Sequence, residues 1–364
     1  MIDAGKRWLK IRACKAWLDR HERFLIPFAL IVGVVIDFVT FRSIQIGWSF
    51  LILAIYLVLA SLAIVLLNAH KLQHRLLLWL QAFAPLVLQF VFGALLSASL
   101  VFYWFSGALS VSWPILILLA VLMTSNEVLR HYYLRPLIQM SVLFFALFSV
   151  STSFFPYLFH TVDAWVFLVS GLLSFVLMLA FTLMLSSCSP TIQQDQSRIT
   201  ISIFFIALFM NGLYVLNIIP PIPLSLREAQ VFHYLERVGE RYLVLDEEKT
   251  WMESLFPVQI VHLTSGERAF VYTSIFAPTK LSTSIIHRWS YYDEVSRSWV
   301  ERGQFSFPLS GGRDQGYRGY SYKSQLQTGK WRVRVETPRG QVLANIRFNV
   351  VIESVPAVLI QSFR

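Results

Sequence analysis

Charged side chains are scarce over more than half of this sequence. Residues 24–219 contain six lysine or arginine and four aspartate or glutamate residues, whereas about 25% of the residues in a typical soluble domain are charged. This scarcity excludes an ordinary soluble domain, and the long apolar runs of the segment are typical of membrane-spanning helices. Residues 224–364 hold 18 basic and 14 acidic residues, the balance of a water-exposed domain. The chain therefore divides into a membrane part and a soluble part.

Motifs for catalysis and metal binding are also missing. There is no Gly-X-Ser-X-Gly motif, and the glycine-rich run Gly311–Gly316 lacks the Gly-Lys-Ser/Thr ending of phosphate-binding loops, so we interpret this run as a hairpin loop. His70 and His74 lie one helical turn apart, but no third ligand is specified. Both cysteines, Cys14 and Cys188, lie outside the soluble part. We therefore predict neither a metal nor a cofactor, and no disulfide framework in the soluble part.

The soluble part does contain the residue types of a nucleophilic triad. They are His287, Ser321 or Ser324, and Asp314. Residue types alone do not define a triad, because a triad is recognised by its geometry. We therefore assign no catalytic residue and expect that the protein is not an enzyme.

Apolar segments long enough to cross a bilayer recur along the membrane part. A helix needs about 20 apolar residues to span about 30 Å of hydrocarbon. Seven segments meet or approach this length, namely Phe24–Phe41, Ile46–Leu67, Leu76–Phe105, Gly107–Thr124, Leu137–Phe159, Trp165–Leu185 and Ile199–Ile219. Ser106-Gly107 separates the third from the fourth. We predict a helical bundle of about seven transmembrane helices, and the sequence leaves a count of six open.

The connecting loops differ strongly in positive charge. With the N-terminus in the cytoplasm, the inner segments 1–23, 68–75, 125–136 and 186–198 hold twelve lysine or arginine residues, and the short outer loops hold one. Basic residues collect on the cytoplasmic side because they are hard to translocate and are attracted to anionic lipid. The same tendency accounts for the net charge of +10 without a nucleic-acid partner. We predict a multi-pass membrane protein with a cytoplasmic N-terminus and a C-terminal domain outside the cytoplasm.

One ionisable side chain, Asp37, falls within the predicted spans. Ionisable groups are costly in hydrocarbon, so each is a candidate for transport or catalysis. Asp37 lies close to Arg42 and to the outer interface, where pairing with this arginine or with headgroups is the simpler interpretation. Gln89 is expected to form interhelical hydrogen bonds. A pump for charged solutes is therefore not indicated.

The soluble part begins after the proline-rich run Pro220–Pro223. Ser225, with Glu228 three residues on, can cap a helix that we predict to extend through Arg241. From Val258 the apolar period changes to two, which predicts strands at Val258–Leu263, Ala269–Phe276, Ser284–Tyr292, Gln304–Pro308, Tyr317–Ser324, Lys330–Glu336 and Gln341–Val350. Short strands at this spacing indicate a small all-β, sandwich-like domain.

These strands carry a pattern of aromatic, basic and glycine residues. The pattern consists of His287-Arg288-Trp289, Arg318-Gly319-Tyr320-Ser321-Tyr322-Lys323, Gly329-Lys330-Trp331-Arg332-Val333, Gly340, Leu343 and Phe348-Asn349-Val350. It resembles the bacterial domain of unknown function family 2914 over roughly residues 280–351. Tyr320 stands where many members carry tryptophan, and the loop at residues 310–316 is longer than usual. The resemblance implies a small β domain on a bacterial membrane protein, with no established activity. With the predicted orientation, we expect an inner-membrane protein whose C-terminal domain is periplasmic or extracellular.

Aromatic and basic residues also suggest a binding surface. The candidate residues are Arg288, Trp289, Tyr291, Arg318, Tyr320, Tyr322 and Lys323. Aromatic rings with basic neighbours can bind an envelope glycan or an envelope protein, although strand alternation can instead place such rings in the core. We predict a non-enzymatic envelope-binding module. The alternatives are a membrane enzyme or carrier for a lipid-like or neutral substrate, and a membrane scaffold. The oligomeric state stays open.

The predicted organisation thus has five segments. They are a basic cytoplasmic N-terminal segment (1–23), a transmembrane domain (24–219), a proline-rich linker with a connecting helix (220–257), the β-sandwich (258–352) and a C-terminal tail (353–364).

Overall fold

The computed structural model describes residues 46–69, 75–129, 132–220, 223–248, 258–278, 281–312 and 316–364. Two compact units are distinguished. The first contains the described residues up to Val101 together with Leu116–Ser151 and Ser170–Met210. The second contains Phe102–Ile115, Thr152–Val169 and Asn211–Arg364. The predicted N-terminal segment 1–23, the first predicted span 24–41, and Asp37, Arg42, His70, His74 and Asp314 lie outside the described residues.

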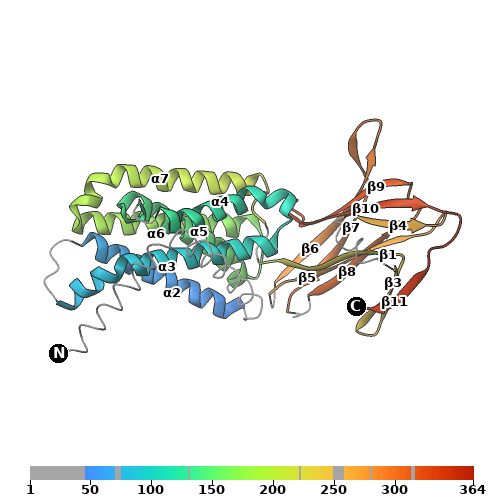
Figure 1. Ribbon diagram of the computed structural model, residues 1–364, viewed down its shortest axis with the longest axis horizontal. Helices are drawn as coiled ribbons and strands as arrows, with labels where there is room; N and C mark the ends of the chain where they lie inside the picture. Colours follow the sequence, from blue (N-terminus) through green and yellow to red (C-terminus); the bar gives the residue numbers. More distant parts are fainter. Residues whose placement is uncertain are drawn as a thin grey trace, which may run out of the picture. The chain divides into compact units, whose positions relative to one another are not determined.

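Six helices of the described residues are long and apolar enough to cross a membrane. They are α2 (Ile46–Asn68), α3 (Arg75–Ser106), α4 (Leu109–Val128), α5 (Pro136–Phe159), α6 (Ala164–Cys188) and α7 (Pro190–Val215), with a short 3-10 helix η1 (Tyr132–Leu134) before α5 (Figure 1). Each overlaps a predicted span, and α3 and α4 are separated at the predicted break. The protein is therefore a multi-pass membrane protein.

Amide and hydroxyl groups connect these helices. Gln89 of α3 donates to Glu127 of α4 at 3.0 Å, and Asn126 donates to the Gln89 carbonyl at 2.9 Å. Asn68 donates to Gln139 at 2.9 Å. The predicted interhelical role of Gln89 is confirmed, and its partner Glu127 lies in α4. In lipid, such bonds satisfy polar groups that water cannot reach.

The soluble part contains eleven strands among its described residues. They are β1 (Ser225–Phe232), β2 (Tyr234–Val238), β3 (Arg241–Glu247), β4 (Gln259–Leu263), β5 (Ala269–Phe276), β6 (Ser282–Asp293), β7 (Ser298–Ser310), β8 (Tyr317–Lys323), β9 (Gly329–Glu336), β10 (Val342–Ile352) and β11 (Leu359–Phe363). The first sheet has the order β1-β5-β8, the second β4-β10-β9-β6-β7 and the third β11-β3-β2. All pairs are antiparallel except β4 with β10.

The predicted connecting helix is wrong. Strands β1 and β2 occupy its residues, and β3 follows after a two-residue turn at Gly239-Glu240, where Gly239 has a φ of 62°. The apolar residues at every third position favoured a helix, but Val231 and Phe232 are both buried, on opposite faces of the first sheet. Pairing with β5 therefore overrides the local pattern. The predicted tail likewise contains β11, so the β-domain extends well beyond 258–352.

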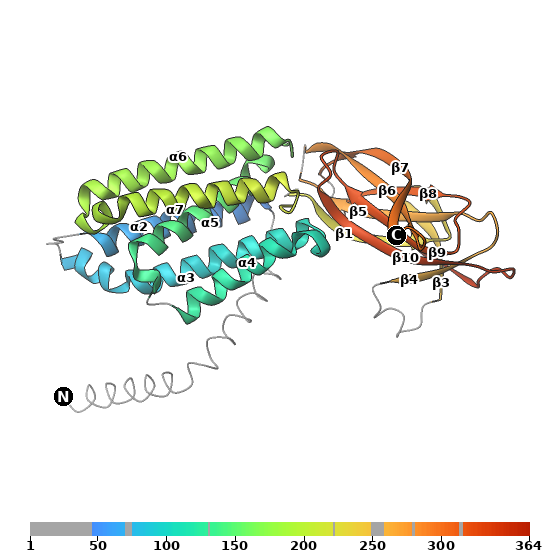
Figure 2. The same cartoon turned by 90° about the horizontal axis from the view of Figure 1, so that it is seen from above.

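The three sheets (Figures 1 and 2) are held together by two hydrophobic layers. The main core lies between the first and second sheets, and its largest fully buried side chain is Trp289. A smaller core lies on the other face of the first sheet, where Phe232, Phe270 and Tyr272 pack against Leu235, Tyr242 and Val244 from β2 and β3. Burial of aromatic rings on both faces of one sheet supplies much of the stability of this domain.

The turn between β9 and β10 also packs within the second unit. Thr337 and Gly340 close it through two backbone hydrogen bonds, and Gly340 has a φ of 89°. The Arg339 guanidinium lies 3.9 Å from the Tyr214 ring centroid and donates to its hydroxyl at 3.0 Å. This residue therefore ties the turn to the end of α7.

Candidate functional site

The His-X-Trp and Ser-X-Lys motifs meet inside the sandwich. His287 and Trp289 point inward from β6, and Ser321 points inward from β8 in the facing sheet. The Trp289 indole Nε1 donates to the Ser321 hydroxyl at 2.9 Å, and that hydroxyl lies 2.9 Å from His287 Nδ1. Thr273 of β5 lies 3.1 Å from His287 Nε2. The two sheets are therefore joined by a buried polar chain.

The hydrogen-bond directions in this chain follow from its donors. The indole can only donate, so the Ser321 hydroxyl accepts from it. Thr273 donates to the Gly319 carbonyl at 3.4 Å, so its oxygen accepts from a protonated His287 Nε2, and the unprotonated Nδ1 then accepts from Ser321. The neutral imidazole satisfies every partner. Burial lowers the pKa of His287 to about 3, which is consistent with this state.

This arrangement does not suit nucleophilic catalysis. His287 and Ser321 do form the hydrogen bond of a triad, but their exposed fractions are 0% and 3%. The Ser321 hydroxyl already accepts a hydrogen bond from the Trp289 indole. The second imidazole nitrogen of His287 contacts Thr273 and not a carboxylate. Ser324, the other serine considered, is exposed at the end of β8. The motif residues therefore stabilise the sandwich.

The seven predicted surface residues fall into three places. Trp289 is fully buried in the main core, so the prediction is wrong for this residue, because strand alternation points it inward. Tyr291 packs on Trp331, with ring centroids 5.2 Å apart, and Arg288 lies on the outer face of the second sheet. Arg318, Tyr320, Tyr322 and Lys323 share strand β8.

Tyr320 and Tyr322 belong to a group of exposed rings on the outer side of the first sheet. We define the tyrosine surface as Tyr234, Tyr320 and Tyr322, which are 41%, 40% and 44% exposed. Phe270, only 7% exposed, lies beneath all three, with ring-centroid distances of 6.0, 6.4 and 5.5 Å respectively. The exposed rings are thus held in place by a buried ring.

Basic and polar groups border the tyrosine surface. The Arg268 guanidinium lies 5.2 Å from the Tyr322 ring centroid. The Tyr234 hydroxyl donates to Glu236 at 3.0 Å. Arg318 donates to the Glu240 carbonyl at 3.0 Å, and Lys323 to the Arg302 carbonyl at 2.7 Å. The predicted basic residues of β8 therefore bond to backbone, and Arg268 provides the cation beside the rings.

Sequence reasoning missed Tyr234, Phe270 and Arg268 as members of this surface. Tyr234 lay in the predicted connecting helix. The Gly239-Glu240 pair between two short runs that contain aromatic and β-branched residues was a hairpin signal that could have revealed β2 and β3. Recognition of that hairpin would have moved Tyr234 from a helix to a strand.

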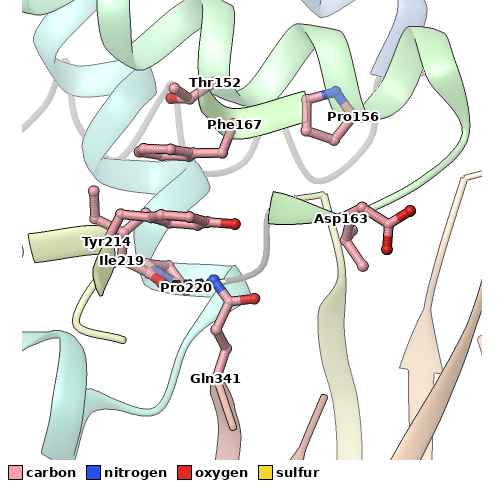
Figure 3. A pocket seen from close by; sticks show the side chains of 9 residues that line it. Thr152, Pro156, Asp163, Phe167, Tyr214, Ile219, Pro220 and Gln341 are labelled. Carbon is pink, nitrogen blue, oxygen red and sulfur yellow. Dashed lines mark hydrogen bonds between the residues drawn. The ribbon is translucent and has the colours of Figure 1, made fainter. Parts of the chain in front are cut away.

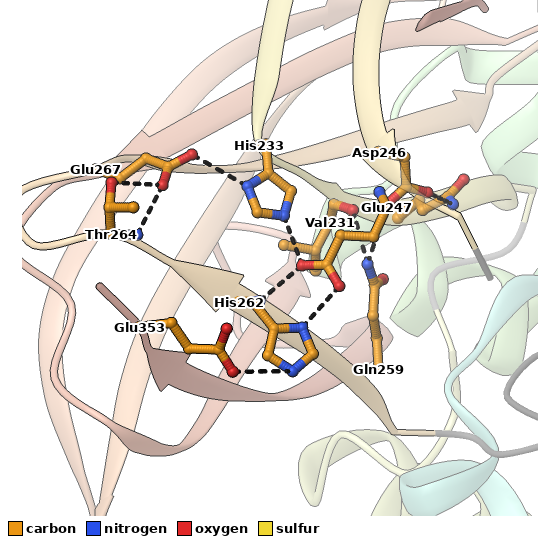
Figure 4. Close-up of polar contacts among 10 residues, drawn as sticks. Val231, His233, Asp246, Glu247, Gln259, His262, Thr264, Glu267 and Glu353 are labelled. Atoms are coloured by element: carbon orange, nitrogen blue, oxygen red, sulfur yellow. Dashed lines mark hydrogen bonds and ion pairs between the residues drawn. The ribbon is translucent and has the colours of Figure 1, made fainter. Parts of the chain in front are cut away.

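A second polar cluster joins β1, β3 and β4 (Figure 4). The Glu247 carboxylate contacts His233 Nε2 at 2.7 Å and His262 Nδ1 at 2.8 Å, and it accepts the His262 backbone N–H at 2.7 Å. Glu267 contacts the other nitrogen of His233 at 3.1 Å. Burial raises the pKa of Glu247, but the hydrogen bonds from His262 and His233 outweigh it and hold the pKa below its usual value. No group of three potential ligands among the described residues could hold a metal.

Two cavities among the described residues are poorer candidates for a ligand site than the tyrosine surface. The first has a volume of about 20 Å³, room for one water, beside the stacked rings of Phe167 and Tyr214, whose centroids are 3.6 Å apart (Figure 3). The second, of about 280 Å³, lies along α3. Its polar residues are already bonded, Gln89 to Glu127 and Tyr133 to Ser125.

Ser321→Ala is expected to destabilise the β-domain by about 1–3 kcal/mol, because it leaves the buried Trp289 indole N–H without an acceptor. The exposed Ser324→Ala is the matched control and should change stability by less than about 0.5 kcal/mol. Thermal unfolding of the full chain in detergent, followed by hydrogen exchange of β5 and β8, measures both. Equal stability of the two variants would contradict the role assigned to Ser321.

The buried neutral His287 predicts acid sensitivity. Below pH about 6.5 the unfolded chain binds a proton that folded His287 rejects, so stability should fall as pH decreases from about 6.5 towards about 3, by at most about 1.4 kcal/mol per pH unit. Unfolding of the β-domain in the wild type and in His287→Asn, measured between pH 7 and 5, isolates this contribution. The free energy of unfolding should fall less steeply with decreasing pH in the variant than in the wild type. Identical slopes would refute the contribution of His287.

Comparisons with known proteins agree with the sequence motifs and add no activity. Residues 282–350 match the family described as "Protein of unknown function (DUF2914)". The search of curated proteins found no match.

Similar solved structures include an immunoglobulin-like protein from Pseudomonas aeruginosa, with 9% identity, a TM-score of 0.22, and coverage of 36% of this chain and 98% of that one. A β-glucosidase from Listeria innocua in complex with gluconolactone has 13% identity, a TM-score of 0.19, and coverage of 34% of this chain. The present chain spans 16% of that enzyme. Similarity at these scores carries no argument about function. The matched region, which begins at β6 and ends within β10, therefore identifies the C-terminal part of this multi-pass membrane protein as similar to family DUF2914.

Proposed function

We propose that the protein is a membrane-anchored, non-enzymatic binding protein whose β-domain binds a neutral glycan of the bacterial envelope through the tyrosine surface. The observation that carries the proposal is that Tyr234, Tyr320 and Tyr322 are each about 40% exposed while resting on buried Phe270. The exposed faces of these rings are apolar surface in contact with water, which is unfavourable in free energy. Covering them with a flat apolar face of a ligand removes that surface from water and therefore favours binding. The C–H face of a sugar ring has this character.

The rigidity of the rings favours binding further. Each tyrosine has few rotatable bonds, and the buried ring beneath restricts them, so little conformational entropy is lost when a ligand binds. The hydroxyl of Tyr234 and the guanidinium of Arg268 lie at the border of the rings, where they can bond to sugar hydroxyls. The membrane enzyme, carrier and scaffold alternatives have no comparable arrangement in their favour among the described residues.

We also propose that the β-domain faces away from the cytoplasm. The connections after α2, α4 and α6 carry Lys71, Arg75, Arg130 and Arg135, and Arg198 lies near the start of α7, whereas the connections after α3 and α5 carry no lysine or arginine. Since α7 runs from the basic side, its end lies on the side of the uncharged connections, and the β-domain follows it. By the positive-inside rule, the β-domain is then outside the cytoplasm whether or not residues 24–41 form a further span.

Tyr320→Ala and Tyr322→Ala should each weaken glycan binding by about tenfold or more, because each removes a ring from the contact surface. Tyr292→Ala, on the second sheet, is the matched control and should leave affinity unchanged. Binding of chitohexaose, a β-1,4-linked aminosugar oligomer, to the full chain in detergent measures the effect by calorimetry. Absence of binding by the wild type, or equal losses in all three variants, would reject this surface as a glycan site.

A C-terminal fusion after Arg364 should be active with an alkaline phosphatase reporter and non-fluorescent with green fluorescent protein. A fusion after Leu185 should give the reverse, because the positive charges hold that end of α6 in the cytoplasm. Fluorescence of the Arg364 fusion would place the β-domain in the cytoplasm and exclude a periplasmic ligand.

A further inference from the structure

The outer face of the second sheet contains a group of arginines in register. On β9, Arg332 lies opposite Arg347 of β10 and Ser290 of β6. Two residues further along β9, on the same face, Arg334 lies opposite Asn345 of β10 and Arg288 of β6. We define the arginine face as Arg288, Arg332, Arg334 and Arg347. Like charges directly opposite each other on a sheet repel and destabilise it.

Carboxylates neutralise only part of this charge. Arg288 pairs with Glu336 and Glu301, and Arg334 lies 3.9 Å from the same Glu336. Among the described residues, no carboxylate lies within ion-pair distance of Arg332 or Arg347. The arginine face therefore has four guanidinium groups against two carboxylates, and the excess is concentrated on one directly opposed pair.

Packing, and not hydrogen bonding, holds the central arginine in place. The Arg332 guanidinium lies 4.4 Å from the centroid of the Trp299 ring. The Nε atoms of Arg332 and Arg334 are buried, and no acceptor among the described residues bonds to them. Burial, together with the positive charges of Arg334 and Arg347, lowers the pKa of Arg332. A guanidinium fixed by stacking and without an acceptor is prepared to bind an oxyanion.

We propose that the arginine face is a phosphate-binding site, with the phosphate group held between Arg332 and Arg347 and flanked by Arg334. The charge excess matches a dianion, and the planar guanidinium groups present paired N–H donors that fit the oxygens of phosphate. Neutral sugars do not supply this charge, so the site is distinct in chemistry from the tyrosine surface and on a different sheet. Binding here does not depend on the function proposed above.

The test uses Arg332→Gln/Arg347→Gln in the full chain, reconstituted in nanodiscs of zwitterionic phosphatidylcholine. Inorganic phosphate should raise the unfolding temperature of the wild type saturably, beyond the effect of chloride at equal ionic strength. The double variant should bind phosphate at least tenfold more weakly. Without ligand it should unfold at a higher temperature than the wild type, because the opposed charges are removed. A purely structural role of the two arginines predicts the opposite shift.

The matched control is Lys330→Gln/Arg297→Gln, which removes the same charge from the neighbourhood. Lys330 is already paired with Glu294 at 2.8 Å, and Arg297 lies in the exposed turn before β7, so this variant should keep wild-type affinity. A second arm adds phosphatidylglycerol vesicles. Binding of inorganic phosphate supports a soluble phosphate compound, and binding of the vesicles alone supports a lipid headgroup. If neither binds, or if both double variants lose binding equally, the site is refuted.

Discussion

The buried hydrogen-bond chain from Trp289 through Ser321 and His287 to Thr273 is the constraint on which the β-domain depends. It connects the two main sheets, which otherwise meet through apolar contacts that have no preferred direction. A polar chain in a core is tolerated only when every donor has an acceptor, so it fixes how β6 faces β5 and β8. That register in turn determines which side chains of β8 point outward, and hence where Tyr320 and Tyr322 are exposed.

The family motif can be explained in the same terms. Trp289, Trp331, Phe348 and Val350 belong to one core cluster, and His287 and Ser321 supply its polar link. A pattern that suggests catalytic chemistry in the sequence is therefore a pattern of packing. The two proposed binding surfaces are formed by outward-facing residues, namely the tyrosines of β2 and β8 and the arginines of β6, β9 and β10. Core residues and residues of the proposed surfaces thus alternate along the same strands.

The third sheet gives the domain its exposed rings. Without β2, β3 and β11, the outer face of the first sheet would expose Phe232 and Tyr272, which are now 0% and 1% exposed. The third sheet covers this face only in part, and Tyr242, buried within it, contacts Tyr320 at a ring-centroid distance of 6.1 Å. The tyrosine surface lies at the edge of the area that the third sheet covers. On the arginine face, on the opposite side of the sandwich core, Arg347 is exposed and Arg332 is stacked on Trp299.

The six helices of the described region and the strands from β4 to β10 could be predicted from the sequence alone. The length of an apolar segment and the alternation of apolar with polar residues are local properties of the sequence, so they can be recognised without knowledge of tertiary contacts. The strands within Ser225–Arg241 could not be predicted, because they form through pairing with β5 and β3, which lie elsewhere in the chain. The burial of Trp289 and the exposure of Tyr320 were not predictable either, because alternate side chains of a strand point to opposite faces, and composition does not reveal which face is covered.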